Sequence, residues 1–339
     1  MTITTQLPAP ILRSTDHVLS SLPFLLGFIP RDSAVLLWIH EGKLALTQRV
    51  DLPYVATQME LSEDLELWAQ EVARVAHQVS AQEVLIIVNR PDSALAATLC
   101  RSLIELGVYP GAVWCLNEDR YCEFDFTNAQ FSTSWITMSP QVSAEVVDDF
   151  VSAGWSFLND RNALIDEVTG DLDAQHEVLT LLRGVELNHV NPADDAQRDK
   201  LIALIVAAIV DDEVDNTTVG LVCVSLLDLC VRDCVLWKLS ARSAQDSFAA
   251  KLRDFVRAAP SGLRAPIATV AAIYAWMLGD GVRANAALGQ ALLDDPTYGL
   301  ALMMEIALRN GVAPRHWQAM MQELTYDAAR WSGAPSERV

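Results

Sequence analysis

The sequence predicts an α/β (or α+β) domain with a mixed sheet over residues 1–154, followed by an all-α helical domain over residues 155–339. Two observations predict this division. In the front half, short β-branched runs alternate with segments of helical period, and from about Ser143 onward only helical periods remain. The length of 339 residues also suits two domains. We place the junction near Gly154, at the start of a polar, irregular stretch.

The chain should begin with a short helix and an antiparallel hairpin. Ser14 can cap the helix, and Pro23 and Gly27 should end it. Residues 34–40 and 44–51 have the composition of strands and are separated by a Glu-Gly turn. Because the connection is so short, the two strands should pair with each other.

The rest of the front domain should place helices on the sheet. Residues 65–79 carry apolar side chains at helical spacing, and the wholly apolar run 84–88 is typical of a buried strand. A second helix is expected over 94–106. Residues 112–116 and 120–126 then form a second hairpin. The pattern therefore indicates a mixed sheet.

Helical periods dominate the remainder of the chain. The expected helices are residues 145–153, 195–210, 219–239 and 244–258, with four more after Gly262.

One stretch of the helical domain, residues 279–296, resembles the second half of a tetratricopeptide repeat. Small, large and helix-breaking residues fall at the spacing of that repeat: Ala272, Ala284, Leu288, Ala291 and Pro296. Two antiparallel helices approach closely only where small side chains face each other. This pattern predicts tetratricopeptide-like helix hairpins, and an ordinary helical bundle without a groove is the alternative.

The net charge and the length of the apolar runs argue against two classes of partner, nucleic acids and membranes. The formal net charge of −20 opposes contact with nucleic-acid phosphates and anionic lipids. No apolar run reaches the ~20 residues that a membrane span requires. We expect neither a nucleic-acid partner nor a membrane, and a cytoplasmic location.

The cysteines indicate reduced, buried thiols, since none forms a CxxC pair. Cys223, Cys230 and Cys234 fall on one face of the expected helix 219–239, where small apolar side chains are a better interpretation than metal ligands. The acidic run 211–215 does not fit a calcium-loop template. We expect no cofactor and no metal.

Both ends of the chain carry a family resemblance. The segment SLPFLLGFIPRDSAVLL, followed by QRVDLP, resembles the opening signature of the actinobacterial domain-of-unknown-function 4192 family. The segment from Trp276 to DDPTYGLA resembles its closing signature. The resemblance implies a bacterial cytoplasmic origin and no assigned activity. It also implies signature positions: Pro23, Gly27, Pro30, Asp32, Ser33, Arg49, Asp51 and Pro53.

Polar residues flanking the predicted strands are the candidate ligand-binding residues: Asp32, Ser33, Arg49, Asp51, Asn89 and Arg90. Asn89 and Arg90 follow a buried strand and precede a helix, where open α/β sheets bind ligands. The sequence has no phosphate-binding glycine motif there. The same side chains could simply fix the hairpin to the preceding turn through an Arg–carboxylate pair.

Two functions remain open at this stage. The preferred one is a protein-interaction or scaffold module, whose helical domain binds a protein segment near Tyr274, Arg283, Tyr298 and Arg309. The alternative is a small-ligand sensor or an enzyme that uses the polar residues of the front domain. Dimerisation through an edge strand is a third interpretation.

Overall fold

The computed structural model describes residues 13–53, 61–153, 155–183, 195–210, 215–242 and 245–331. The chain forms two compact units, Met1–Ala163 and Leu164–Val339. The first unit holds a mixed sheet with helices, and the described part of the second is helical, which confirms the predicted fold class. Gly154, the expected junction, lies outside the described residues.

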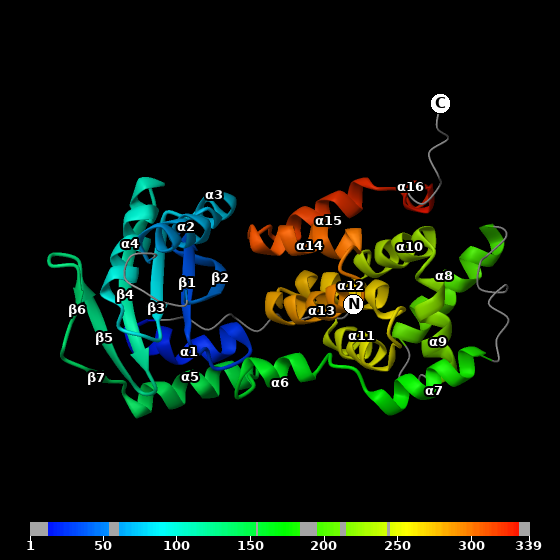
Figure 1. Ribbon diagram of the computed structural model, residues 1–339, viewed down its shortest axis with the longest axis horizontal. Helices are drawn as coiled ribbons and strands as arrows, with labels where there is room; N and C mark the ends of the chain where they lie inside the picture. Colours follow the sequence, from blue (N-terminus) through cyan, green and yellow to red (C-terminus); the bar gives the residue numbers. More distant parts are fainter. Residues whose placement is uncertain are drawn as a thin grey trace. The chain divides into compact units, whose positions relative to one another are not determined.

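The elements of the first unit follow one another as helices and strands (Figure 1). They are α1 (Thr15–Leu26), β1 (Ser33–His40), β2 (Lys43–Asp51), α2 (Leu61–Ala73), α3 (Val75–Val79), β3 (Glu83–Val88), α4 (Ser93–Glu105), β4 (Tyr109–Asn117), β5 (Arg120–Asp125), β6 (Gln130–Phe131), β7 (Ile136–Thr137) and α5 (Pro140–Ser152). Helix α6 (Arg161–Asp166) follows at the boundary of the two units.

The strands are ordered β2-β1-β3-β4-β5-β6, and β7 also pairs with β5. Strands β3 and β4, joined by α4, are the parallel pair of this sheet, and the other neighbours are antiparallel. Both predicted hairpins are confirmed: Ser33 pairs with Asp51, and Cys115 pairs with Cys122. Strands β6 and β7 were not predicted, because each is two residues long and too short to show an alternating pattern.

One face of the sheet packs on helices α2, α3 and α4. Ala34, Leu36 and Trp38 of β1 share a core with Ala69 of α2 and Leu99 of α4. The alternating residues of β1 are also buried, so this strand is covered on both faces. That explains why its sequence is a continuous apolar run.

Helices α1 and α5 pack against each other, apart from α2 and α4 (Figure 1). Phe24 of α1 forms a small core with Val146 and Phe150 of α5. The expectation that Pro23 helps to end α1 is corrected, because the helix passes through Pro23 to Leu26. The helix ends where Gly27 adopts a left-handed conformation with φ of 73°.

The second unit consists of helices in its described part. They are α7 (Leu172–Arg183), α8 (Asp195–Val210), α9 (Asn216–Ser225), α10 (Leu229–Ser240), α11 (Asp246–Ala258), α12 (Arg264–Met277), α13 (Gly281–Asp294), α14 (Gly299–Arg309), α15 (Pro314–Glu323) and α16 (Tyr326–Trp331). No described helix of the chain is long and apolar enough to cross a membrane.

The predicted helix 219–239 is corrected to two helices, α9 and α10. Asp228 interrupts the helix because its side chain accepts hydrogen bonds from the amides of Cys230 and Val231, which makes it the N-cap of α10. Cys223 therefore lies on a different helix from Cys230 and Cys234.

Helix α12 is the centre of the second unit. Every one of its residues is buried, and its neighbours include α11 and α13. Ala272 of α12 and Ala284 and Ala291 of α13 are completely buried, as close approach of two helices requires. Asp294, at the end of α13, accepts hydrogen bonds from the amides of Arg264 and Ala265 and so caps α12.

Candidate functional site

The candidate ligand-binding residues of the first unit lie at one end of the sheet. Ser33 begins β1, Asp51 ends β2, and Asn89 follows β3. The antiparallel register sets Ser33 opposite Asp51, Val35 opposite Arg49, and Ala34 opposite Val88. Residues directly opposite one another point to the same face, so Ser33, Arg49 and Asp51 share the face turned away from the α2–α4 core.

Ser33 and Asn89 form a closed hydrogen-bonded pair. The hydroxyl of Ser33 donates to Oδ1 of Asn89 over 3.2 Å, and the Asn89 amide donates to the carbonyl of Leu116 over 3.5 Å. Ser33 is completely buried. These bonds join the ends of β1, β3 and β4, so both side chains have structural partners.

Arg49 is the most constrained side chain of this group. Its Nη1 lies 2.7 Å from Oδ1 of Asp51, and its Nη2 donates to the carbonyl of Arg31 over 3.3 Å. Its guanidinium carbon lies 6.0 Å from the centre of the Phe28 ring. The Nε of Arg49 is buried without a hydrogen-bond partner. The geometry matches the predicted tie between the hairpin and the preceding turn.

The chain itself covers this end of the sheet. Phe28 is buried and forms an isolated bridge with Leu158, and Arg161 of α6 lies 3.8 Å from Asp51. The indole of Trp68 donates to the carbonyl of Asp51. Arg49 is thus enclosed by protein groups.

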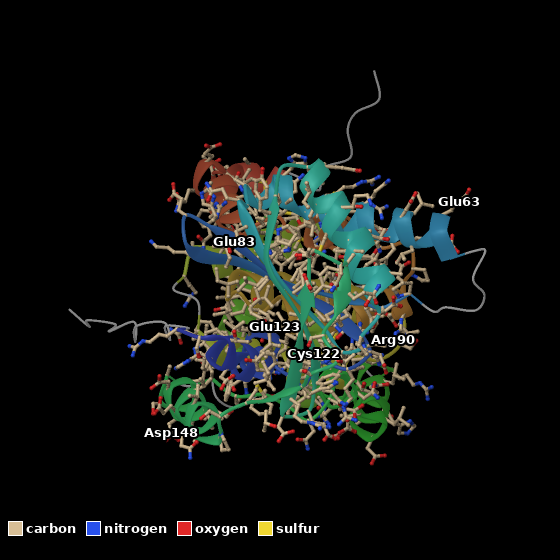
Figure 2. The ribbon with its side chains drawn as sticks, turned by 90° about the vertical axis from the view of Figure 1, so that its left-hand side faces the viewer. Glu63, Glu83, Arg90, Cys122, Glu123 and Asp148 are labelled. Atoms are coloured by element: carbon tan, nitrogen blue, oxygen red, sulfur yellow. The ribbon has the colours of Figure 1, made fainter. Side chains whose placement is uncertain are left out.

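Asp32 and Arg90 take part neither in the Ser33–Asn89 hydrogen bond nor in the Arg49–Asp51 ion pair. Asp32 is exposed and has a positive φ of 45°, a conformation that costs a non-glycine residue energy. Arg90 lies at the surface (Figure 2), with Nη2 3.9 Å from the carboxylate of Asp92, which caps α4. Four of the six candidates, namely Ser33, Asn89, Arg49 and Asp51, therefore have partners among themselves at this end of the sheet, and Asp32 and Arg90 lie at its surface.

The four partner-binding candidates of the second unit occupy different environments. Tyr274 is only 1% exposed, and its hydroxyl accepts a hydrogen bond from the amide of Gln245. Its expected place at a binding surface is therefore corrected to the core. Tyr298 accepts a hydrogen bond from Arg232, whose guanidinium lies over its ring. Arg309 is exposed and pairs with Glu305.

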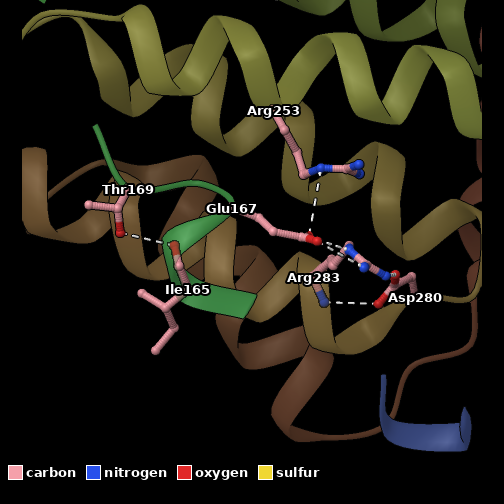
Figure 3. A network of polar contacts seen from close by, with 6 residues as sticks. All are labelled: Ile165, Glu167, Thr169, Arg253, Asp280 and Arg283. Carbon is pink, nitrogen blue, oxygen red and sulfur yellow. Dashed lines mark hydrogen bonds and ion pairs between the residues drawn. The ribbon is translucent and has the colours of Figure 1, made fainter. Parts of the chain in front are cut away.

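Arg283 belongs to a charged network (Figure 3). Its Nε lies 2.7 Å from Glu167 Oε2, its Nη1 lies 2.8 Å from Asp280, and Arg253 approaches Glu167 at 3.8 Å. Burial of Glu167 opposes its ionisation, but hydrogen bonds from Arg283 and the charges of Arg283 and Arg253 hold its pKa below the usual value. The network fixes Glu167 to α11 and α13.

The cysteines are free and buried. Burial raises the pKa of Cys100, Cys115 and Cys223 to about 12, which disfavours the thiolate form. Among the described residues, no three His, Cys, Asp or Glu side chains gather as metal ligands. Residues 211–214, most of the predicted acidic run, lie outside the described residues, and Asp215 caps α9.

Two helices carry exposed apolar faces that were not predicted from the sequence. On α14, Leu302, Met303 and Ile306 are exposed, although α14 also buries Ala301 and Met304. On α5, Val147 and Val151 are exposed beside the buried Val146 and Phe150. Both helices are apolar on more than one face, and this pattern could have been read from the sequence as a sign of further packing.

A family model described as a domain of unknown function, DUF4192, matches residues 16–315. The chain belongs to the DUF4192 family. No curated protein and no solved structure matches the chain.

The DUF4192 match includes the end of the sheet described above. Several residues of this end have structural roles. Gly27 ends α1, Asp32 makes the turn into β1, and Arg49 ties that turn to β2. In this DUF4192 chain, these three residues therefore fix the entry to the sheet.

Proposed function

We propose that this DUF4192 chain is a protein-interaction module whose helical unit binds an amphipathic helix of a partner protein. The observation that carries the proposal is the outer face of α14. Met303 and Ile306 are 61% and 60% exposed, and Leu302 lies beside them at helical spacing. A helix with an exposed apolar face in addition to its buried one normally packs between other elements.

The proposal that the partner segment is a helix follows from the way the helices of this unit pack. Helix α12 packs on α13, and α13 packs on α14, so each helix covers the apolar face of its neighbour. Stacked arrays normally end in a helix whose outer face is polar. On α14 the outer face of Leu302, Met303 and Ile306 is apolar instead, and a partner helix would continue the stack. The ion pair of Glu305 and Arg309 borders the face and supplies polar contacts at its rim.

Photo-crosslinking tests this function. A photoreactive amino acid placed at Met303 in the organism that encodes the chain should cross-link to one partner segment, whereas the same group at the exposed Gln318 should not. The isolated segment should be helical when bound. The double variant M303E/I306E should weaken its binding at least ~30-fold, since burying each such side chain contributes about 1.5–3 kcal/mol.

The matched control is Q318E/Q322E, which adds the same charge at exposed positions of α15. It should leave the affinity unchanged. Cross-linking at Met303 to a second copy of the chain, or binding that survives M303E/I306E, would overturn the proposal.

A small-ligand function at the sheet end is the second candidate, favoured by the buried Arg49 Nε that lacks a hydrogen-bond partner. A ligand from a screen of nucleotides, metabolites and divalent metals at 100 times its Kd should raise stability by about 2.7 kcal/mol. That increment should vanish in R49A and D51A. A ligand increment that persists in both folded variants would reject this candidate.

We further propose a cytoplasmic location, which the six free, buried cysteines support, since a secreted chain would tend to pair them. An actinobacterial origin and a tetratricopeptide-like character of α12 and α13 are also part of the proposal. The second rests on the buried small residues Ala272, Ala284 and Ala291.

A further inference from the structure

The outward face of α5, in the first unit, carries a stripe of exposed apolar side chains. Val147 and Val151 are one helical turn apart and are 41% and 57% exposed. Trp155 follows the helix, is 46% exposed, and is held against its end by a hydrogen bond from its amide to the carbonyl of Phe150. We name these three residues the α5 stripe.

The buried side of α5 is already used within the unit. Val146 and Phe150 pack with Phe24 of α1, and the rings of Phe24 and Phe150 stack at 4.8 Å. The α5 stripe is therefore not needed for that core. Trp155 contacts the edge of Phe150 with one side of its indole and leaves nearly half of its surface open.

Asp148 borders the α5 stripe, because it lies three residues before Val151, whereas Glu145 and Asp149 are two residues from the valines and lie on the other flank of the helix. Glu145, Asp148 and Asp149 lie on the exposed surface of α5, and Asp148 projects from this helix in Figure 2. None of the three makes an ion pair with another described residue. The sequence contains no Lys or Arg between Arg120 and Arg161, so α5 and the segments directly before and after it carry no lysine or arginine.

We propose that the α5 stripe and the adjoining carboxylate of Asp148 bind a cationic amphipathic helix of a partner protein. The apolar side of such a helix would cover Val147, Val151 and Trp155, and a Lys or Arg at its edge would lie beside Asp148. A second copy of this chain would oppose like charges, and the negative headgroups of a membrane would do the same. A partly exposed Trp is the residue type that most often dominates a binding interface.

The α5 stripe is a separate surface from α14, because the two helices belong to different units. In addition, the α5 stripe is expected to select a positively charged partner. A chain that uses both would hold two partners, as a scaffold does.

The test uses the full chain and a fluorescent Leu/Lys amphipathic helical peptide as the probe, with its Leu/Glu counterpart as the negative probe. Fluorescence anisotropy should show binding of the Leu/Lys peptide alone. The variant V147S/V151S, which changes only exposed side chains, should weaken binding about tenfold. W155A should weaken it at least as much, and circular dichroism should show both variants folded.

A variant on α5 and a matched control on α2 test whether charge is required. D148N should weaken binding severalfold and reduce its salt dependence, since one charge fewer acts across the interface. E63Q removes the same charge from an exposed position of α2 and should change nothing. Equal binding to all variants would mean a nonspecific attraction to an acidic chain and would overturn the proposal.

Two further outcomes would also overturn it. Sedimentation could show a dimer that V147S/V151S dissociates, in which case the α5 stripe joins two copies. Alternatively, vesicles with anionic headgroups could bind the chain in a way that W155A abolishes, in which case the stripe contacts a membrane.

Discussion

At the scale of single residues, most of the distinctive polar side chains have partners within the fold. Arg49 pairs with Asp51 and lies over Phe28, and Arg283 pairs with Glu167 and Asp280. Burial makes such pairs sensitive to the loss of one member, because the remaining charge keeps its desolvation cost. We therefore expect substitutions of these arginines to affect the stability of the fold more than they affect binding.

The Glu167 network predicts a pH dependence. Because the folded pKa of Glu167 is lowered, its ionised form stabilises the fold above the unfolded pKa of about 4.3, and this contribution is lost as the pH falls through the folded pKa. E167Q should lower the unfolding free energy by about 1–2 kcal/mol at pH 7 and by progressively less as the pH falls below about 4.3. Thermal melts of both proteins across this range measure the difference.

E305Q is the control for that experiment, because the Glu305–Arg309 pair is exposed and should contribute little at any pH. A constant difference between the wild type and E167Q from pH 7 to pH 3 would contradict the assigned role of the ion pairs.

At the scale of elements, helix caps decide where the chain turns. Asp228 separates α9 from α10, Asp92 begins α4, and Gly27 ends α1. Periodicity across 219–239 predicted one helix because the apolar spacing hardly changes at the break. In the sequence Asp228 is one Asp among many, so the cap is not recognisable there. The break matters because α9 and α10 pack at different places in the core.

Substitution of the α10 cap tests this interpretation. D228A should cost about 1–2 kcal/mol and should speed hydrogen exchange at the amides of Cys230 and Val231, which lose their acceptor. D228N should keep most of that protection, since Asn is also a good cap, while it weakens the ion pair with Arg198. Equal loss of protection in both variants would assign the effect to Arg198 instead.

At the scale of the whole molecule, two separate cores account for the two units. One contains the sheet with α2–α4, and the other surrounds α12. The segment 155–163 belongs to the first unit. Leu158 exchanges backbone hydrogen bonds with Gly27 and Ile29, and Phe157 packs edge-on against Phe24.

Truncation tests this boundary. Residues 1–163 should fold as a stable fragment, and residues 1–154 should be less stable by at least ~2 kcal/mol, because the shorter fragment loses three backbone hydrogen bonds and the packing of Phe157. Urea denaturation of the two fragments measures the difference. Equal stability of both would place the boundary near Gly154, as the sequence suggested.

The sequence alone determined the fold class, the two hairpins, the helical nature of the second unit and the family. These features depend on local periodicity, turn residues and a signature that each lie within one short segment. The sequence could also predict that Arg49 and Asp51 share a strand face, because the period of a strand is two.

Only the tertiary structure decided which of those residues have their bonds satisfied and which apolar faces remain open. Tyr274 and Tyr298 are the same residue type, yet Tyr274 is buried within α12, whereas Tyr298, just before α14, lies against Arg232. Likewise, Val146 and Val147 are neighbours in the chain, and only contact with Phe24 distinguishes them. Exposure depends on which distant segments pack together, and no local pattern contains that information.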